Sequence, residues 1–137
     1  MDLRQLTPDL SVAPQIEPED MRRLAEAGFT AVIANRPDSE VGPSHQSARM
    51  AELAAEAGLD FHYLPILPGQ LGPEQVRALR EILDGAQGKV LAYCRSGTRS
   101  TMAWALGQAG RRPAAEIMQA AARAGYDLSD LIPALEG

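Results

Sequence analysis

The sequence predicts a single α/β domain spanning residues 1–137, with a mostly parallel central sheet flanked by helices. Short apolar segments, typical of buried strands, alternate with segments in which apolar residues recur every three or four positions, as in helices. This alternation favours parallel strands joined by helical crossovers. The length of 137 residues suits one domain with a sizeable core, and we find no repeat, low-complexity tract or linker that would divide it.

The first 34 residues are expected to contain three strands and one helix. Alternating apolar residues in 3–15 predict two short edge strands joined by a turn. A helix from Pro18 to Gly28 should follow, because proline suits the first turn of a helix and glycine its end. Residues 29–34 are mostly apolar, which is typical of a central strand.

The rest of the chain continues the alternation. Ser44 is a candidate N-cap for a helix that Gly58 ends, and residues 60–64 form the next expected strand. Pro73 is placed to start another helix. The remaining expected elements are a strand at Val90, a helix from Ser100, a helix from Pro113 to Ala124 and a short helix near Asp127.

The only cysteine, Cys94, is expected in a tight loop between a buried strand and a helix. Gly97 lets such a loop curl without steric cost, and a helix N-terminus offers unpaired N–H groups and the positive end of a dipole. Arg95 and Arg99 add positive charge. These groups favour a thiolate and can hold an anion beside it. The alternative is that Cys94 is a small buried hydrophobe.

Polar groups around Cys94 are candidate ligands for an anionic substrate. The loop amides, the hydroxyl groups and the guanidinium groups can all donate hydrogen bonds. Arg36 follows another strand end, and the carboxyl ends of parallel strands lie at one edge of a sheet, so it is expected to border the same pocket. The candidate catalytic residues are Cys94 and Arg99, and the candidate substrate-binding residues are Arg36, Arg95, Ser96, Gly97, Thr98 and Ser100.

The segment from Cys94 to Ser100 resembles the active-site loop of rhodanese-type sulfurtransferases. The whole chain also resembles the DUF442 family, the phosphatase-like domain of beta-lactamase-hydrolase-like proteins, in residues 10–16, 28–38 and 64–69 as well as in this loop. The resemblance implies a fold similar to that of dual-specificity phosphatases. It also implies a contribution of Arg36 to the pocket.

Two departures from the phosphatase pattern favour sulfur transfer as the function. Arg99 follows Cys94 in Cys-x4-Arg spacing, whereas phosphatase loops of this fold resemble Cys-x5-Arg. The segment 65–71, where such phosphatases place an acidic residue, has no carboxylate. General acid catalysis contributes about 10²–10⁴-fold, but sulfur transfer has a good leaving group and can proceed without it.

The favoured hypothesis is therefore a cysteine-dependent sulfurtransferase. Cys94 would take the sulfane sulfur of thiosulfate or a persulfide, and the amides of residues 95–100 would hold the resulting persulfide. Because the chain has one cysteine, the acceptor must come from outside the chain, as an external thiol or another thiophile. The alternative is a cysteine-dependent phosphatase with a phosphocysteine intermediate. A third possibility is a binding module that senses an anion or an oxidant without turnover.

Composition limits the partners that the sequence predicts. The net charge of −5 argues against nucleic-acid binding, and no apolar run is long enough for a membrane span. The lone cysteine and the N-terminal sequence, which lacks the features of a signal peptide, suggest the cytoplasm. Two scattered histidines predict neither a metal site nor a cofactor. The expected partners are a small anionic sulfur donor, an external thiol and, by resemblance, a sulfur dioxygenase of the metallo-beta-lactamase fold.

Overall fold

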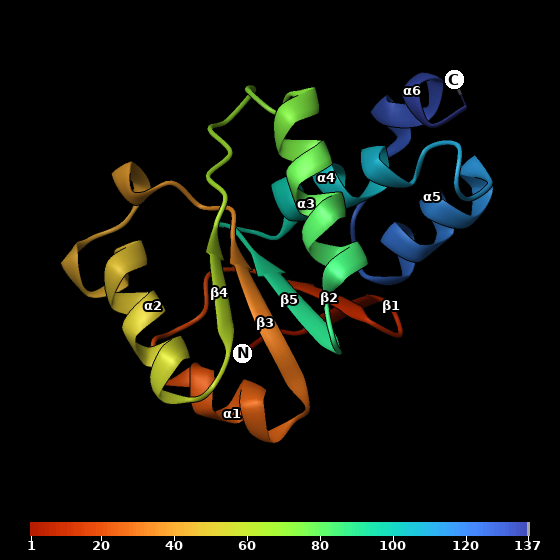
Figure 1. Cartoon of the computed structure of the whole chain (residues 1–137). Coiled ribbons are helices and arrows are strands. Elements are labelled where there is room, and N and C mark those ends of the chain that lie inside the picture. The colour runs from red at the N-terminus through yellow and green to blue at the C-terminus, as the bar shows by residue number, and fades with distance from the viewer. Residues whose placement is uncertain (137) are drawn as a thin grey trace.

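The computed structural model describes residues 1–136, and its centre is a five-stranded sheet with the strand order β1-β2-β5-β3-β4 (Figure 1). Strand β1 (Arg4–Thr7) pairs antiparallel with β2 (Leu10–Ala13). The other strands run parallel to β2, and they are β5 (Lys89–Tyr93), β3 (Phe29–Ala34) and β4 (Asp60–Tyr63). The predicted α/β architecture with a mostly parallel sheet is confirmed.

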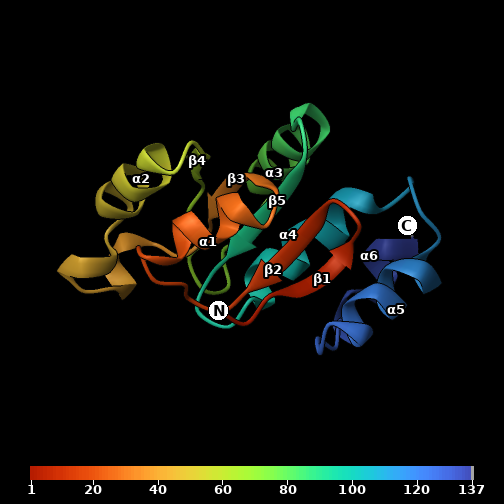
Figure 2. The ribbon, with the colours of Figure 1, turned by 90° about the horizontal axis from the view of Figure 1, so that it is seen from below.

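Helices cover both faces of this sheet (Figure 2). Helices α1 (Asp20–Glu26) and α2 (Ser47–Glu56) pack on one face. The helices on the other face are α3 (Pro73–Gly85), α4 (Thr98–Gln108), α5 (Ala114–Arg123) and α6 (Ile132–Glu136). The core therefore consists of two layers of apolar side chains, one on each side of the sheet.

The central strand β5 contributes to both layers. Val90 and Ala92 pack with the helices of the α3–α6 face, whereas Leu91 and Tyr93 pack with those of the α1–α2 face. Successive side chains of a strand point to opposite faces, so a strand covered on both sides is apolar throughout. This is the continuous apolar run that predicts the strand in the sequence.

Register brings the carboxyl ends of four strands to the same edge of the sheet. Tyr93 at the end of β5 pairs with Ala13 of β2 on one side and with Ala34 of β3 on the other, and Ala34 pairs with Tyr63 of β4. The segments that leave these strands therefore begin side by side. Ligands of open parallel sheets bind at such an edge.

Two local expectations are wrong. Strand β2 is not at the edge of the sheet, because β5 pairs with its other side and all four of its residues are buried. Ser44 lies in a short 3₁₀ turn and does not cap α2, which begins at Ser47. Instead, the carboxylate of Asp38 accepts a hydrogen bond from the backbone N–H of Ser47 at 2.6 Å.

The last predicted helix also begins later than expected. Asp127 accepts a hydrogen bond from the N–H of Ser129 at 2.9 Å in a local turn, and α6 follows a 3₁₀ turn.

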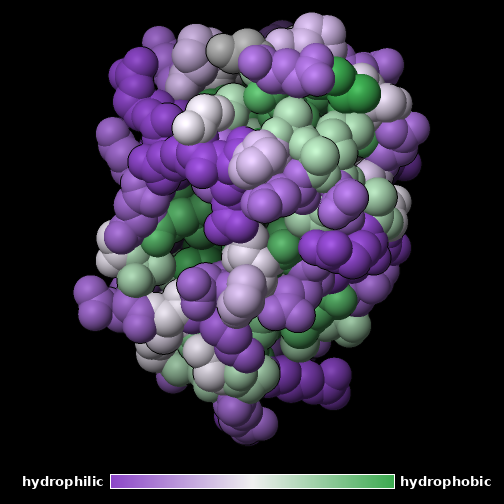
Figure 3. Space-filling view, turned by 90° about the vertical axis from the view of Figure 1, so that its right-hand side faces the viewer, coloured by the Kyte–Doolittle hydropathy of each residue, from purple (hydrophilic) through white to green (hydrophobic). Residues whose placement is uncertain are grey.

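On the side where the C-terminal helices lie, hydrophilic residues cover most of the surface and apolar residues show as separate small areas (Figure 3). Among residues 1–136, no helix combines the length and the apolar character needed to cross a bilayer.

The packing of β5 yields a stability prediction. Leu91 is fully buried in the middle of the sheet. Replacing it with alanine should lower the free energy of unfolding by about 2–5 kcal/mol, because the change removes buried methyl groups and leaves a cavity. Chemical denaturation would measure this. Leu3→Ala, at a side chain that is 39% exposed, is the control and should cost less than about 0.5 kcal/mol.

Candidate active site

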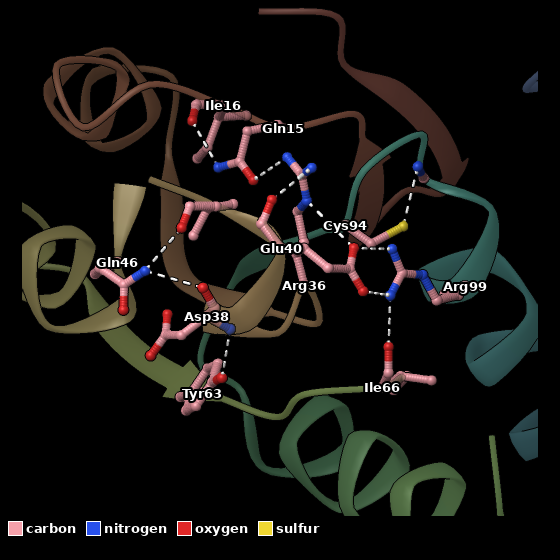
Figure 4. A network of polar contacts seen from close by, with 12 residues as sticks. Gln15, Ile16, Arg36, Asp38, Glu40, Gln46, Tyr63, Ile66, Cys94 and Arg99 are labelled. Carbon is pink, nitrogen blue, oxygen red and sulfur yellow. Dashed lines mark hydrogen bonds and ion pairs between the residues drawn. The ribbon is translucent and has the colours of Figure 1, made fainter. Parts of the chain in front are cut away.

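Cys94 lies directly after β5, at the edge where the four parallel strands end. Its side chain is fully buried, and its sulfur accepts a hydrogen bond from the backbone N–H of Gly97 at 3.1 Å (Figure 4). The predicted position between a strand and the N-terminus of a helix is therefore observed. Within residues 1–136, Gly97 provides the one loop amide that bonds this sulfur. The hydroxyl and guanidinium groups that the sequence predicts as further donors have the contacts described below.

Gly97 needs to be a glycine for two reasons. Its φ of +94° lies in the left-handed region, and a β-carbon at this position would lie 2.0 Å from the hydroxyl oxygen of Tyr126. That hydroxyl donates a hydrogen bond to the carbonyl oxygen of Ser96 at 2.8 Å. Tyr126 therefore closes over the backbone of the loop and holds the peptide whose N–H faces the sulfur of Cys94.

Arg99 lies in the first turn of α4, and neighbouring groups hold its guanidinium on two sides. Nη1 and Nη2 donate to the two carboxylate oxygens of Glu40 at 2.8 and 2.7 Å, and Nη1 also donates to the carbonyl oxygen of Ile66 at 2.6 Å (Figure 4). These bonds use three of the five N–H groups of a guanidinium. The N–H of Nε and the second N–H of Nη2 form the remaining edge, which can bind two oxygens of an anion.

Charge at this position is balanced by Glu40. The hydrogen bonds from Arg99 hold the pKa of the Glu40 carboxyl below its usual range, so the group is ionised at neutral pH. The pKa of Arg99 is raised, first by the hydrogen bond to Glu40 and further by the neighbouring sulfur of Cys94.

Arg36 supports Glu40 and does not offer its guanidinium to a ligand in this structure. Its Nη1 donates to the side chain of Gln15 at 3.2 Å, and its Nη2 donates to the carbonyl oxygen of Glu40 at 3.1 Å. Its Nε lies 3.4 Å from a carboxylate oxygen of Glu40. The predicted position beside the pocket is observed, but the contacts make Arg36 a support for Glu40.

The hydroxyl groups of the loop are also occupied. The buried hydroxyl of Ser100 donates to the side-chain oxygen of Asn35 at 2.8 Å. The hydroxyl of Ser96 donates to that of Thr98 at 3.0 Å. The first bond joins the start of α4 to the residue that follows β3, and the second joins the loop to the first residue of α4. By contrast, the side chain of Arg95 is exposed and has no hydrogen bond or ion pair within the described part of the chain.

An open cavity of about 600 Å³ lies over this loop. Residues of the three loops that follow β3, β4 and β5 line it. They are Arg36, Ser39, Glu40, Leu67, Pro68, Arg95 and Arg99. With three guanidinium groups and one carboxylate, the lining is positive, although the chain as a whole carries a net charge of −5. A positively charged cavity of this kind concentrates anions beside the loop that follows Cys94.

The lining offers no group that is ready to donate a proton. Glu40 is ionised between two arginines. Asp38 lies on the same loop, but its two carboxylate oxygens bond the backbone N–H and the hydroxyl of Ser47 at 2.6 and 2.7 Å, which caps α2. The segment 64–72 has no carboxylate. The arrangement can thus hold an anion beside a sulfur nucleophile, and its leaving group must depart without an acid from this lining.

Several residues that build the site carry no signal near Cys94 in the sequence. From distant parts of the chain, Glu40 accepts hydrogen bonds from Arg99 of α4 and Tyr126 donates one to the loop. The carbonyl oxygen of Ile66 is a backbone group and so has no sequence signature. The Asn35-Arg36 segment after β3 is a hint of this kind in the sequence, because the fold brings strand ends together.

Comparison with known proteins places the chain among phosphatase-like proteins. The family described as "Beta-lactamase hydrolase-like protein, phosphatase-like domain" matches residues 2–111. A beta-lactamase hydrolase-like protein of Agrobacterium fabrum is 30% identical over 121 residues, which are 87% of this chain and 28% of that protein. One of Xylella fastidiosa is 29% identical over 131 residues, 93% of this chain and 30% of that protein. The chain spans less than a third of the length of these relatives.

Solved structures agree with this placement. A putative phosphatase of Neisseria meningitidis matches with a TM-score of 0.86 and 30% identity, covering 99% of this chain and 97% of that one. A putative DUF442 phosphatase of Shewanella putrefaciens matches with a TM-score of 0.74 and 27% identity, covering 98% and 84%. Kinase associated phosphatase, with a TM-score of 0.73 but 15% identity over 98% of this chain and 90% of that one, shows a shared fold.

The geometry at Gly97 yields a prediction with a matched control. Gly58 also has a positive φ, of +82°, but a β-carbon there would meet nothing within 4 Å. Gly58→Ala should therefore cost only the left-handed strain, about 1–2 kcal/mol. Gly97→Ala should cost about 1–3 kcal/mol more, because the methyl group collides with Tyr126. Chemical denaturation measures both, and equal losses would contradict the role assigned to Tyr126.

The electrostatics of Glu40 yield a pH prediction. Because its pKa is lowered in the folded protein, Glu40 stabilises the fold above the pKa of an unfolded carboxyl, and this contribution is lost as pH falls through the folded value. Wild type should therefore be more stable than Glu40→Gln at neutral pH, and the difference should shrink on acidification. Denaturation curves between neutral and acidic pH test this. Glu52→Gln, at an exposed pair, is the control and should show little difference at any pH.

Proposed function

The chain belongs to the family of phosphatase-like domains of beta-lactamase hydrolase-like proteins, and on this basis we propose that it is a cysteine-dependent phosphatase acting through a phosphocysteine at Cys94. The observation that supports this most directly is the hydrogen bond from the amide of Gly97 to the Cys94 sulfur, at the N-terminus of the helix that carries Arg99. The family and the solved relatives above are described as phosphatases or phosphatase-like. They support phosphoryl transfer better than the sulfur transfer that the sequence favours.

The proposed reaction has two displacement steps. The thiolate of Cys94 attacks phosphorus, an S–P bond forms, and the P–O bond to the leaving group breaks with its electron pair on that oxygen. Water then attacks the phosphocysteine, the S–P bond breaks, and phosphate and the thiolate are released. In both steps the free edge of Arg99 would bind two phosphoryl oxygens, and Glu40 would keep that edge in place.

The absence of a ready proton donor in the cavity lining restricts the substrates of this reaction. The leaving oxygen departs as an anion, so esters of acidic alcohols and phenols are the expected substrates. General acid help is worth about 10²–10⁴-fold when it is present. Without it, the rate should depend steeply on the acidity of the leaving group.

Sulfur transfer is the second candidate, and one specific observation favours it. The Cys-x4-Arg loop is one residue shorter than the phosphatase pattern and brings a single amide to the sulfur. In this reaction Cys94 attacks the sulfane sulfur of thiosulfate, the S–S bond breaks, and sulfite leaves. An external thiolate then takes the sulfur as a persulfide and frees Cys94. A sulfur dioxygenase of the metallo-beta-lactamase fold would be a fitting partner for that product.

A leaving-group series tests the first proposal. We expect hydrolysis of aryl phosphates by wild type, loss of hydrolysis in Cys94→Ser, and a fall in kcat of roughly 10²-fold or more from the 4-nitrophenyl ester to the phenyl ester. Steady-state kinetics would measure the fall. A flat series would mean that some group does protonate the leaving oxygen.

Mass spectrometry separates the two candidates. Phosphatase function predicts trapped phosphocysteine at Cys94 after rapid acid quenching with an aryl phosphate. A gain of one sulfur atom on Cys94 after incubation with thiosulfate or glutathione persulfide, together with no hydrolysis of any phosphate ester, would replace the first proposal by the second. Cys94→Ser is the control for both measurements.

A further inference from the structure

The cavity lined by Arg36, Arg95 and Arg99 carries more positive charge than one reacting anion requires. Arg36 and Arg99 are both bound to Glu40, so these three groups together contribute a single positive charge. Arg95 adds a second one, and its side chain is without a hydrogen bond or ion pair anywhere in residues 1–136. The reacting group would bind at Arg99, which leaves the guanidinium of Arg95 for another acceptor.

The size and the walls of the cavity indicate an organic substrate. A water molecule takes up about 30 Å³ of liquid, so a tetrahedral oxyanion of five heavy atoms fills a small part of a cavity of about 600 Å³. Leu67, whose side chain is 44% exposed, and Pro68 form an apolar wall from the loop after β4. A carbon skeleton can pack against this wall, since ligand pockets combine apolar walls with a few polar groups.

We infer that the substrate carries a carboxylate on its leaving portion, and that Arg95 binds this second anionic group while Arg99 binds the reacting one. A guanidinium binds a carboxylate through two parallel N–H groups, which makes arginine well suited to select it. The leaving portion would lie along Leu67 and Pro68, between the two arginines. This inference rests on the proposed phosphatase function and narrows its substrates to acidic organic phosphate esters.

Simple electrostatic steering is the competing explanation for Arg95. Steering by surface charge acts on every anion that approaches the mouth and weakens with salt. Recognition acts on the carboxylate alone. Steering also favours the more highly charged of two esters, so the ratio of their kcat/KM values is compared between Arg95→Gln and a variant of a distant arginine, since only recognition makes its loss specific to Arg95.

The experiment compares 4-nitrophenyl phosphate with its 3-carboxymethyl derivative, in which a methylene group keeps the acidity of the phenol nearly the same. We expect kcat/KM to be about tenfold higher for the carboxymethyl ester, mainly through KM, because one charge-assisted hydrogen-bonded pair is gained. In Arg95→Gln the ratio should fall to about one. Arg112→Gln is the matched control, since it removes the same charge from an exposed arginine beyond the far end of α4 and should keep the wild-type ratio.

Each outcome bears on a definite claim. Hydrolysis of both esters at equal kcat/KM by wild type would overturn the inference and leave the phosphatase proposal standing. A preference that survives in Arg95→Gln would overturn the assignment to Arg95. An equal loss of preference in Arg95→Gln and Arg112→Gln would favour steering and also overturn it. Hydrolysis of neither ester would refute the proposed function, and the inference with it.

Discussion

The bidentate contact between Glu40 and Arg99 is the interaction on which the rest of the site depends. An arginine side chain has several rotatable bonds, and a guanidinium that could turn freely would present its donors to a ligand only part of the time. The carboxylate of Glu40 takes one edge, the carbonyl oxygen of Ile66 takes a further N–H, and Arg36 holds Glu40 in turn. The edge that is left is fixed before any ligand arrives, and such preorganisation is what makes electrostatic stabilisation effective.

The sheet makes this contact possible because it brings distant loops to one edge, and the buried side chain of Asn35 then joins them. Its amide nitrogen donates to the carbonyl oxygen of Leu64 at 2.9 Å, and its oxygen accepts from Ser100 at 2.8 Å. Its backbone N–H donates to the carbonyl oxygen of Tyr93 at 2.8 Å. One residue thus ties the ends of β3, β4 and β5 together, and a buried amide that lost these partners would pay its full desolvation cost.

The sequence predicts the elements formed by consecutive residues and misses the contacts between residues that are far apart in the chain. The strand before Cys94, the positive φ at Gly97 and the helix after it follow from a dozen consecutive residues. Glu40 and Tyr126 could not be found in the same way, because contacts across the sheet leave no periodic pattern. The failure at Ser44 has the same origin, since Asp38 reaches across a loop to cap α2. The loop spacing and the missing carboxylate in 65–71 favour sulfur transfer, whereas the family and the solved relatives are described as phosphatase-like or as putative phosphatases, so the sequence and the comparisons point to different transferred groups.

The charges of the groups around the cavity indicate which arginine matters for substrate binding. With a thiolate at Cys94, the two positive charges of Arg36 and Arg99 are balanced by the thiolate and by Glu40, so this inner group is neutral. A phosphate monoester brings up to two further negative charges, and the N-terminus of α4 supplies only about half a positive charge. Arg95 is then the remaining full positive charge of the cavity lining that can compensate for the rest. Substrate binding should therefore depend on Arg95 even though the proposed reaction takes place at Arg99. The charges of Arg36, Arg99, Glu40 and the thiolate already balance one another.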